Sequence, residues 1–311
     1  MAVSLARKAF LRMSKSRWLA RAVMSRGFAR RAVKRFMPGE ELTDALDAAR
    51  ELAGAHLGAV LTQLGENLAS QSEADAVRDH YLGVFDRIGE RGLDAHVSVK
   101  PTQLGLDFSQ VRCAERLEAL ATKAEAAGTY LWLDMEDSSY VDRTLNLYRG
   151  LRARHERVGI ALQAYLRRTK GDLAALLPVR PTIRLVKGAY AEPPRVAFPR
   201  KGDTDQAYFD LATELLGAAA SGQALPIMGT HDMALIQRII AKAGELGVKN
   251  GGYEIHMLYG IRMPEQKSLA VQGHTVKTLI SYGASWFPWY MRRLAERPAN
   301  AWFVMRSMLP G

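Results

Sequence analysis

Short apolar segments recur along the chain from about residue 57, and each leads into a polar site and then into a stretch with helical spacing. Strands that alternate with helices predict parallel β-α-β units. Eight such segments favour a closed (β/α)8 barrel over an open sheet. The predicted strands are residues 57–64, 96–99, 130–133, 159–164, 183–186, 225–228, 253–258 and 276–280.

Amphipathic stretches between these strands predict the surrounding helices, among them 72–89, 109–127, 140–154, 204–220 and 232–246. The length of 311 residues is normal for one α/β barrel, and a hydrophobic content of 48% supports a large core. No strand is followed by a G-x-G-x-x-G motif, so a Rossmann dinucleotide site is not expected.

The positive charge of the chain is concentrated at its N-terminus. Residues 1–39 contain eleven Lys or Arg and no Asp or Glu, and the remaining 32 basic residues balance the 32 acidic ones. Apolar residues lie between these cations, which is typical of a basic amphipathic helix on an anionic membrane. A targeting peptide and a solvated or self-packing arm are the alternatives. We therefore expect two parts, a basic helical arm over residues 1–40 and a barrel domain over residues 41–311.

No apolar run approaches the roughly 18 residues that a membrane span needs, so the body is expected to be soluble. No nucleic-acid recognition motif accompanies the basic arm, and a nucleic-acid partner is not expected. The single cysteine, Cys113, excludes an intramolecular disulfide and a cysteine-rich metal site, and it suits a reducing cytoplasm. The composition predicts a cytoplasmic protein held peripherally on the inner face of the membrane.

Polar residues follow the predicted strands where a barrel would bring them together. In a (β/α)8 barrel the carboxyl ends of all strands face one mouth, where active sites lie. We therefore expect a site at this mouth. The residues concerned are Lys100, Asp134, Gln163, Tyr165, Arg184, Lys187, Gly188, Ala189, Tyr190, Thr230, His231, Asp232, Leu258, Tyr259 and Gly260.

Arg184 lies in an otherwise apolar strand, where a lone guanidinium is costly unless it faces an anion. This favours an anionic ligand or cofactor, and the alternative is a core carboxylate such as Asp134 as its partner. Asp134 is also a candidate ion-pair partner for Lys100. The small residues that follow Lys187 would let a phosphate or a ring approach the backbone closely.

Arg292 and Arg293 stand side by side after an aromatic, glycine-marked turn. A guanidinium binds a carboxylate through two parallel hydrogen bonds, so this pair is a candidate carboxylate clamp. The alternative is a solvated helix face on which one arginine pairs with Glu296.

His231, Asp232 and His256 are candidate metal ligands, because they follow or occupy neighbouring strands as the ligands of a barrel hydrolase do. The chain contains no H-x-H or H-E-x-x-H motif and no paired histidines after the first strand. We therefore expect no metal. A metal-dependent barrel hydrolase or lyase remains the rival enzyme class, and a membrane-binding scaffold remains the non-enzymatic alternative.

Seven motifs in order resemble those of the monofunctional bacterial proline dehydrogenases, which are flavoenzymes on a distorted (β/α)8 barrel. The resemblance spans residues from about 57 to 305. The motifs are V-S-V-K-P-T-Q-L-G (97–105), L-D-M-E-D (133–137), A-L-Q-A-Y (161–165), I-R-L-V-K-G-A-Y (183–190), G-T-H-D (229–232), Y-E-I-H-M-L-Y-G (253–260) and R-R-L-A-E-R-P-A-N (292–300).

The resemblance implies FAD at the barrel mouth, oxidation of L-proline to Δ1-pyrroline-5-carboxylate, and transfer of electrons to a membrane quinone. It implies catalytic roles for Asp134 and Arg184, with Arg184 beside the flavin. The other implied cofactor-binding residues are Met135, Gln163, Lys187, Gly188, Ala189, Thr230 and His231. The implied substrate-binding residues are Lys100, Tyr190, Leu258, Leu279, Trp289, Arg292 and Arg293.

Leu279 and Trp289 stand where members of this family usually have tyrosine. The chain reads L-I-S-Y-G at 279–283, where Y-V-P-Y-G is usual, and Trp289 lies three residues before Arg292. These two differences make another cyclic or secondary amino acid the alternative substrate.

Overall fold

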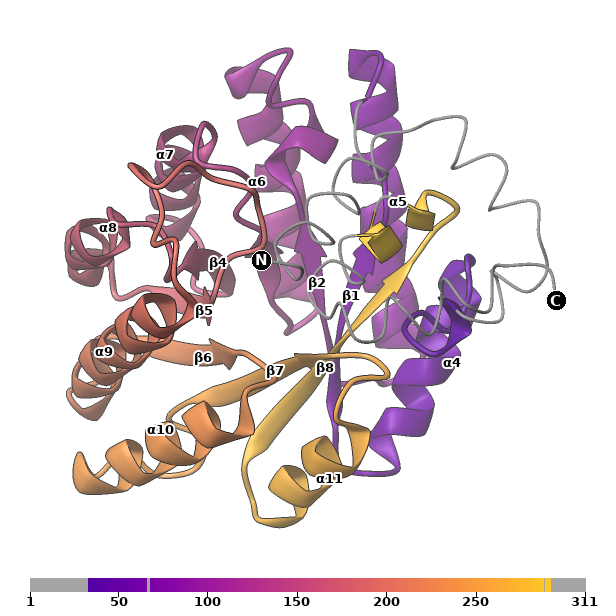
Figure 1. The fold of residues 1–311 in the computed structure, drawn as a ribbon. Helices are drawn as coiled ribbons and strands as arrows, with labels where there is room; N and C mark the ends of the chain where they lie inside the picture. Colours follow the sequence, from indigo (N-terminus) through magenta and orange to yellow (C-terminus); the bar gives the residue numbers. More distant parts are fainter. Residues whose placement is uncertain (1–32, 66–67, 288, 292–311) are drawn as a thin grey trace, which may run out of the picture.

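A closed barrel of eight parallel strands forms the centre of the molecule (Figure 1). The computed structural model describes residues 33–65, 68–287 and 289–291. Neighbours in sequence are neighbours in the barrel, and β8 pairs with β1 to close it, which confirms the predicted (β/α)8 architecture. The strands are β1 (Gly58–Gln63), β2 (Ala95–Val99), β3 (Leu131–Leu133), β4 (Val158–Gln163), β5 (Thr182–Val186), β6 (Leu225–Gly229), β7 (Glu254–Leu258) and β8 (Thr275–Tyr282).

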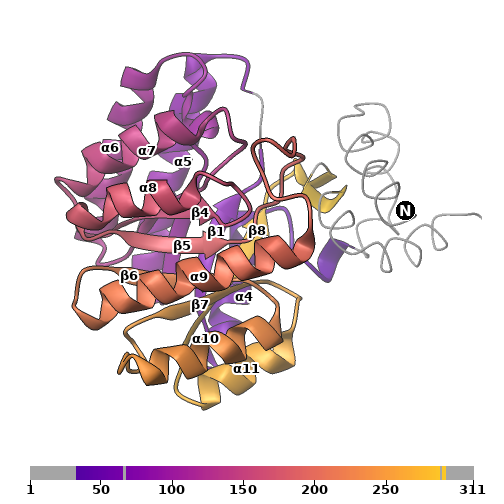
Figure 2. The ribbon, with the colours of Figure 1, turned by 60° about the vertical axis from the view of Figure 1, so that its left-hand side comes forward.

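Helices surround the strands as an outer layer, and Figure 2 shows α9, α10 and α11 along one side of the barrel. The five helices expected from the sequence are present as α5, α6, α7, α9 and α10. Helices α8 and α11 follow β4 and β7, as the repeated strand–helix unit predicts, although no range was named for them; both are short and bury few residues. Helix α4 precedes the first strand and was not predicted. The helices are α4 (Leu42–Ala53), α5 (Gln71–Glu90), α6 (Gln110–Ala126), α7 (Val141–Arg152), α8 (Thr169–Leu176), α9 (Lys201–Ala220), α10 (Met233–Glu245) and α11 (Met263–Val271).

Side-chain caps fix where several of these helices begin. The hydroxyl oxygens of Ser70 and Ser109 accept hydrogen bonds from backbone N–H groups in the first turns of α5 and α6. The Asp232 carboxylate does the same for α10, accepting from the Leu235 N–H at 3.3 Å. Each cap satisfies a donor that the helix itself leaves unpaired. The cap of α10 also places a carboxylate at the end of β6, at the barrel mouth.

The hydrophobic core has two layers, as a barrel requires. One layer lies between the strands and the helices, and a smaller cluster inside the barrel contains Val60, Trp132 and Ile227. Because each strand is buried on both faces, its residues read as an almost continuous apolar run. That burial explains why the strands were predictable from apolar segments.

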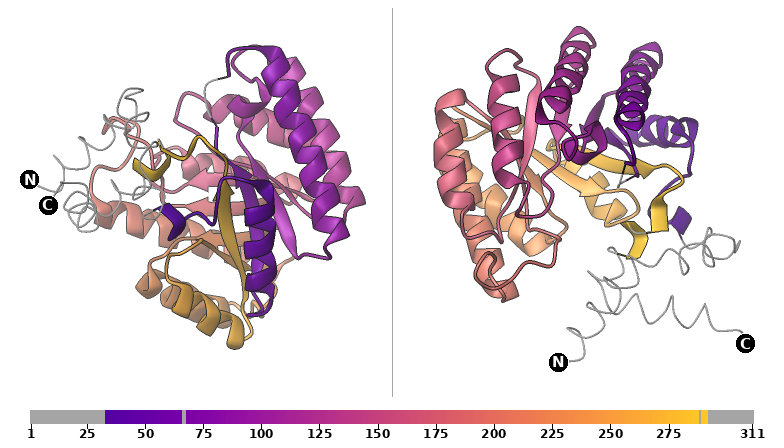
Figure 3. Two further views of the ribbon diagram at one scale, coloured as in Figure 1. Left: turned by 90° about the vertical axis from the view of Figure 1, so that its right-hand side faces the viewer. Right: turned by 90° about the horizontal axis from the view of Figure 1, so that it is seen from above.

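Helix α4 precedes the first strand, yet it packs against both β1 and the last strand, β8 (Figure 3). Just before it, Val33 and Met37 are buried, and the Phe36 ring lies 6.3 Å from that of Tyr290. Gly260 approaches the Arg35 carbonyl so closely that a Cβ there would overlap it. The described end of the arm therefore packs at the loop after β7. None of the helices in the described part of the chain is long and apolar enough to cross a membrane.

Candidate functional site

A cavity of about 720 Å³ opens at the carboxyl ends of the strands, where the sequence predicted a site. Its volume lies within the range of roughly 300–1,000 Å³ that is common for sites of small molecules and cofactors. All eight implied cofactor-binding residues line it, and so do four of the residues that the resemblance implies for catalysis or for the substrate. These twelve are Met135, Gln163, Arg184, Lys187, Gly188, Ala189, Thr230 and His231, with Asp134, Tyr190, Leu258 and Leu279.

The remaining predicted substrate residues are placed differently. Lys100 follows β2 directly, and its backbone N–H donates to the Gln103 side chain at 3.2 Å. Trp289 is buried, and neither Lys100 nor Trp289 lines the cavity. Arg292 and Arg293 lie outside the described residues. The cavity as described therefore contains the predicted cofactor site and part of the predicted substrate site.

Arg184 lines this cavity and is buried, with only 3% of its surface exposed. Its Nη2 donates to Asp134 Oδ1 and, at 2.9 Å, to Ser98 Oγ, and Ser98 Oγ in turn donates to the same carboxylate oxygen at 2.9 Å. Burial lowers the pKa of Arg184 and the Asp134 charge opposes that shift. Asp134, the core carboxylate predicted as an alternative partner of Arg184, is thus one of the partners of Arg184.

Three polar atoms of the cavity residues have no hydrogen-bond partner among the described residues. They are Arg184 Nη1, Gln163 Oε1 and His256 Nδ1, and the first two are a donor and an acceptor. The other end of the Gln163 amide is held, because its Nε2 donates to the Glu136 carbonyl at 2.6 Å. A buried donor and a buried acceptor are costly when unpaired. A ligand that accepts at Arg184 and donates at Gln163 would satisfy both, and a flavin ring carries both kinds of group.

Lys187 follows β5 and lies between two carboxylates. Its Nζ donates to Asp205 at 2.5 Å and to Asp232 at 2.8 Å. The hydrogen bond from Lys187 lowers the pKa of Asp232. Burial acts to raise the pKa of Asp205, but hydrogen bonds from Lys187 and Lys201 outweigh it and the net shift is downward. This network ties the loop after β5 to α9 and to the start of α10.

His231 has a defined hydrogen-bonding role at the cavity wall. Its Nε2 accepts from the backbone N–H of Leu258 at 2.9 Å, which joins the ends of β6 and β7. An imidazole nitrogen that accepts carries no proton, so the proton of a neutral His231 is on Nδ1. The hydrogen bond fixes the ring at the cavity wall.

Gly188 allows the chain to pass close to an aromatic ring. It has φ +113°, in the region that favours glycine, and a Cβ on it would overlap the Tyr165 ring. No side chain therefore stands between the backbone and the cavity at this position. The sequence analysis predicted that a phosphate or a ring could approach the backbone closely after Lys187. The glycine is also required by the fold, because the Tyr165 ring leaves no room for a Cβ at this position.

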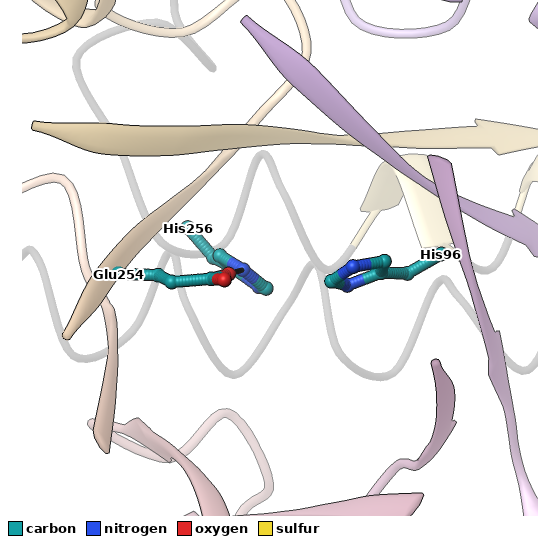
Figure 4. Close-up of side chains that lie close together, drawn as sticks. All are labelled: His96, Glu254 and His256. Atoms are coloured by element: carbon teal, nitrogen blue, oxygen red, sulfur yellow. Dashed lines mark hydrogen bonds and ion pairs between the residues drawn. The ribbon is translucent and has the colours of Figure 1, made fainter. Parts of the chain in front are cut away.

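His96, Glu254 and His256 lie inside the barrel with their candidate ligand atoms within 4.8 Å of one another, and Figure 4 shows the two imidazoles facing each other from β2 and β7. His256 Nε2 lies 2.9 Å from Glu254, and His96 Nδ1 accepts from Trp132 Nε1 at 3.1 Å. Burial, with nearby cations, lowers the pKa of both histidines well below the ordinary value. These hydrogen bonds and the adjacent positive charges favour a neutral, hydrogen-bonded core cluster over a metal site.

Several residues at the site were not singled out from the sequence. Ser98 and Trp132 stand two residues before Lys100 and Asp134, so strand alternation could have placed them inside the barrel. Asp205 comes from α9, and no pattern in the sequence links it to Lys187. The sequence pattern indicates His256 only as a candidate metal ligand, whereas in the structure it lines the cavity and hydrogen-bonds Glu254.

Comparison with known proteins gives concordant matches. A family model described as proline dehydrogenase matches residues 45–306. Proline dehydrogenase 1 of Bacillus subtilis subsp. natto is 35% identical over 304 residues, which cover 97% of this chain and 99% of that protein. Proline dehydrogenase of Deinococcus radiodurans is 36% identical over 286 residues, or 89% of this chain and 90% of that protein.

A solved structure shares the fold. Proline utilization A (PutA) from Bdellovibrio bacteriovorus, inactivated by N-propargylglycine, matches with a TM-score of 0.80 at 23% identity. The match covers 86% of this chain and 33% of that one, so this chain corresponds to about a third of the larger protein. Together with the family model and the two full-length relatives, this shows that the chain is an oxidoreductase of the proline dehydrogenase family.

Proposed function

We propose that the chain oxidises L-proline to Δ1-pyrroline-5-carboxylate with FAD bound in the cavity, and that a membrane quinone accepts the electrons. The observation that carries this proposal is the pair of unpartnered buried atoms, Arg184 Nη1 and Gln163 Oε1, in a cavity of suitable volume. FAD supplies the acceptor for the two electrons that leave the substrate ring. The alternative substrate is another cyclic or secondary amino acid.

The residues of this chain have separate tasks in the proposal. Arg184, held by Asp134 and Ser98, places a fixed positive charge beside the flavin, where reduction adds negative charge. Gln163, Thr230 and His231, with the backbone at Gly188, line the space for the cofactor.

Substrate binding is assigned to Lys100, Arg292 and Arg293, with Tyr190, Leu258, Leu279 and Trp289 around the ring. The resemblance and the fork geometry of guanidinium groups support this assignment. A clamped carboxylate holds the substrate in one orientation, and such positioning lowers the barrier of the reaction. Leu258, Tyr190 and Leu279 line the same cavity as the cofactor residues, which supports a substrate site next to the flavin.

We expect the purified protein to be yellow and to release FAD into the supernatant on acid precipitation. The single thiol, Cys113, is fully buried in α6, donates to the Pro101 carbonyl at 3.5 Å, and has its pKa raised to about 12 by burial. It is therefore unavailable to tether a flavin. The absorption spectrum before precipitation and the supernatant after it give the measurement. A colourless protein, or one that carries metal in place of flavin, would refute the cofactor assignment.

The basic arm is proposed to bring the enzyme to an anionic membrane, where the quinone is. A variant lacking residues 1–30 removes eight of the eleven cations and keeps the buried residues Val33 and Met37. We expect the full chain to float with phosphatidylglycerol vesicles and the variant to remain in solution, because each cation near such a surface contributes about 1 kcal/mol. At 1 M salt, where screening acts over about 3 Å, binding by the full chain should be lost. Equal flotation of both proteins would contradict the proposal that the basic arm binds the membrane.

Leu279 should make the enzyme discriminate against hydroxylated prolines. It lines the cavity as an apolar side chain, so a ring hydroxyl beside it would lose water without gaining a partner, at about 1–3 kcal/mol. We expect kcat/KM for L-proline to exceed that for 4-hydroxyproline by at least about tenfold, and Leu279→Tyr to narrow the ratio. Leu246→Tyr is the matched control, because Leu246 is the exposed residue that follows the last turn of α10 and does not line the cavity, so the ratio should stay unchanged. A native preference for hydroxyproline would contradict this prediction.

A further inference from the structure

Trp132 lies inside the barrel directly against Arg184. The Cζ atom of Arg184 is 4.9 Å from the centroid of the indole, within the range of a cation–π contact. Arg184 lines the cavity, whereas Trp132 does not and is only 1% exposed. The guanidinium therefore contacts both the cavity and the indole, and the indole acts on the cavity only through Arg184.

The hydrogen bonds of Arg184 are all made at one end of its guanidinium group. Both Asp134 and Ser98 accept from the same nitrogen, Nη2, and Nη1 has no partner among the described residues. Two bonds at one nitrogen hold that end of the planar group and leave the Nη1 end to other contacts. Contact with a flat ring restrains the whole plane, because a guanidinium packs against an aromatic face.

The indole itself is held in place from two sides. Its Nε1–H donates to His96 Nδ1 at 3.1 Å, and the planes of the two rings lie 29° apart. The edge of the indole meets the His256 ring at 72° and 5.6 Å. Burial lowers the pKa of His96, so the ring is neutral and Nδ1 keeps the lone pair that accepts from the indole.

Strand β4 makes room for this side chain. A Cβ at Gly159 would overlap the six-membered ring of Trp132. Three different strands supply these features: β3 carries the indole of Trp132, β4 the glycine opposite it, and β2 the acceptor at its nitrogen, His96. Their agreement indicates a fixed orientation for Trp132.

We propose that Trp132 is a positioning residue: its face, oriented by His96, holds the guanidinium of Arg184 at the cavity and so sets how strongly that charge favours reduced flavin. The inference rests on the proposed function, because it takes a flavin as the ligand beside Arg184. Without the indole, the guanidinium can move into the vacated volume and away from the cofactor. The reduced form then loses electrostatic stabilisation.

The test is the midpoint potential of the FAD-bound protein, measured by equilibration with a reference dye. In Trp132→Met, which removes the aromatic face, we expect the ratio of reduced to oxidised flavin at a fixed potential to fall on the order of tenfold, or about 30 mV for two electrons. Trp132→Phe keeps a ring under Arg184 and should recover most of that loss. Trp286→Phe is the matched control, because this buried indole donates to Glu40 at 3.2 Å and does not line the cavity. Its potential should equal that of the native protein.

A native potential in FAD-bound Trp132→Met would overturn the positioning role and leave the proposed function standing. If Trp132→Met does not fold, the midpoint potential of His96→Leu is measured instead, since this variant keeps the indole and removes only the acceptor that orients it. A fall in the same direction, smaller than tenfold, supports the proposal, and an unchanged potential overturns it. A native protein that binds no flavin overturns both this proposal and the proposed function.

Discussion

Asp134→Ala should lower the free energy of unfolding by about 3 kcal/mol and turnover by at least about 100-fold. The substitution leaves Arg184 buried and charged with only Ser98 as a hydrogen-bond acceptor. Removing one partner of a buried pair costs roughly 3–5 kcal/mol, and the lower end applies because the Asp134 side chain is 22% exposed. Urea unfolding and steady-state oxidation of proline measure the two effects.

Asp75→Ala provides a matched control for this substitution. It also removes a carboxylate from a buried arginine, since Asp75 accepts from Arg116 Nε at 2.9 Å. Arg116 keeps two backbone acceptors, the carbonyls of Leu104 and Gln71, and the pair lies away from the cavity. We expect a smaller loss of stability and native turnover. Equal turnover in Asp134→Ala and Asp75→Ala would contradict the role of Asp134 at the site.

Gly188→Ala should abolish most FAD binding. The backbone at φ +113° strains any other residue by about 1–3 kcal/mol, and the new Cβ would overlap the Tyr165 ring. Relief requires movement of the strand end or of the ring, at a further cost of roughly 1–3 kcal/mol. Because Gly188 lines the cavity, that movement changes the cofactor site itself. Flavin content after purification and the thermal midpoint of the protein are the measurements.

Gly217→Ala is the corresponding control, in the last turn of α9. A Cβ there meets no atom within 4 Å, and the glycine is in a helix, where alanine is the better residue. We expect this variant to gain about 0.4–1 kcal/mol of stability and to keep its flavin. A flavin content in Gly188→Ala equal to that of Gly217→Ala would show that the loop after β5 does not approach the cofactor.

The architecture was predictable because barrel strands are buried on both faces. Segments such as 183–186 therefore appear as apolar runs in the sequence, and all eight correspond to strands. The repeated unit predicted a helix after β4 and after β7, but the bounds of α8 and α11 could not be predicted, since each helix is short and buries only two or three residues. Position at a strand end also predicted most of the residues that line the cavity, because parallel strands bring their carboxyl ends to one side. Lys100, Tyr165, Tyr259 and Gly260 were expected at the same mouth and do not line the cavity.

The contacts within the site were less predictable. The sequence did not decide whether Arg184 faces a ligand or a core carboxylate. In the structure Arg184 Nη2 donates to Asp134, whereas Nη1 has no partner among the described residues. Asp134 follows β3 and Arg184 lies in β5, so their contact depends on the curvature of the closed barrel, which is not visible in any local pattern. Likewise, Lys187 meets Asp205 only because α9 packs back against the barrel.

The most direct test of the central proposal is anaerobic addition of L-proline to the purified, FAD-bound protein. Oxidation of one proline transfers two electrons, so we expect the flavin absorbance to bleach with one equivalent of Δ1-pyrroline-5-carboxylate formed per flavin reduced. Addition of a soluble quinone should then restore the oxidised spectrum. If the flavin remains oxidised with L-proline but is bleached by another cyclic amino acid, the substrate assignment is wrong. If no amino acid reduces it, the proposed function is contradicted.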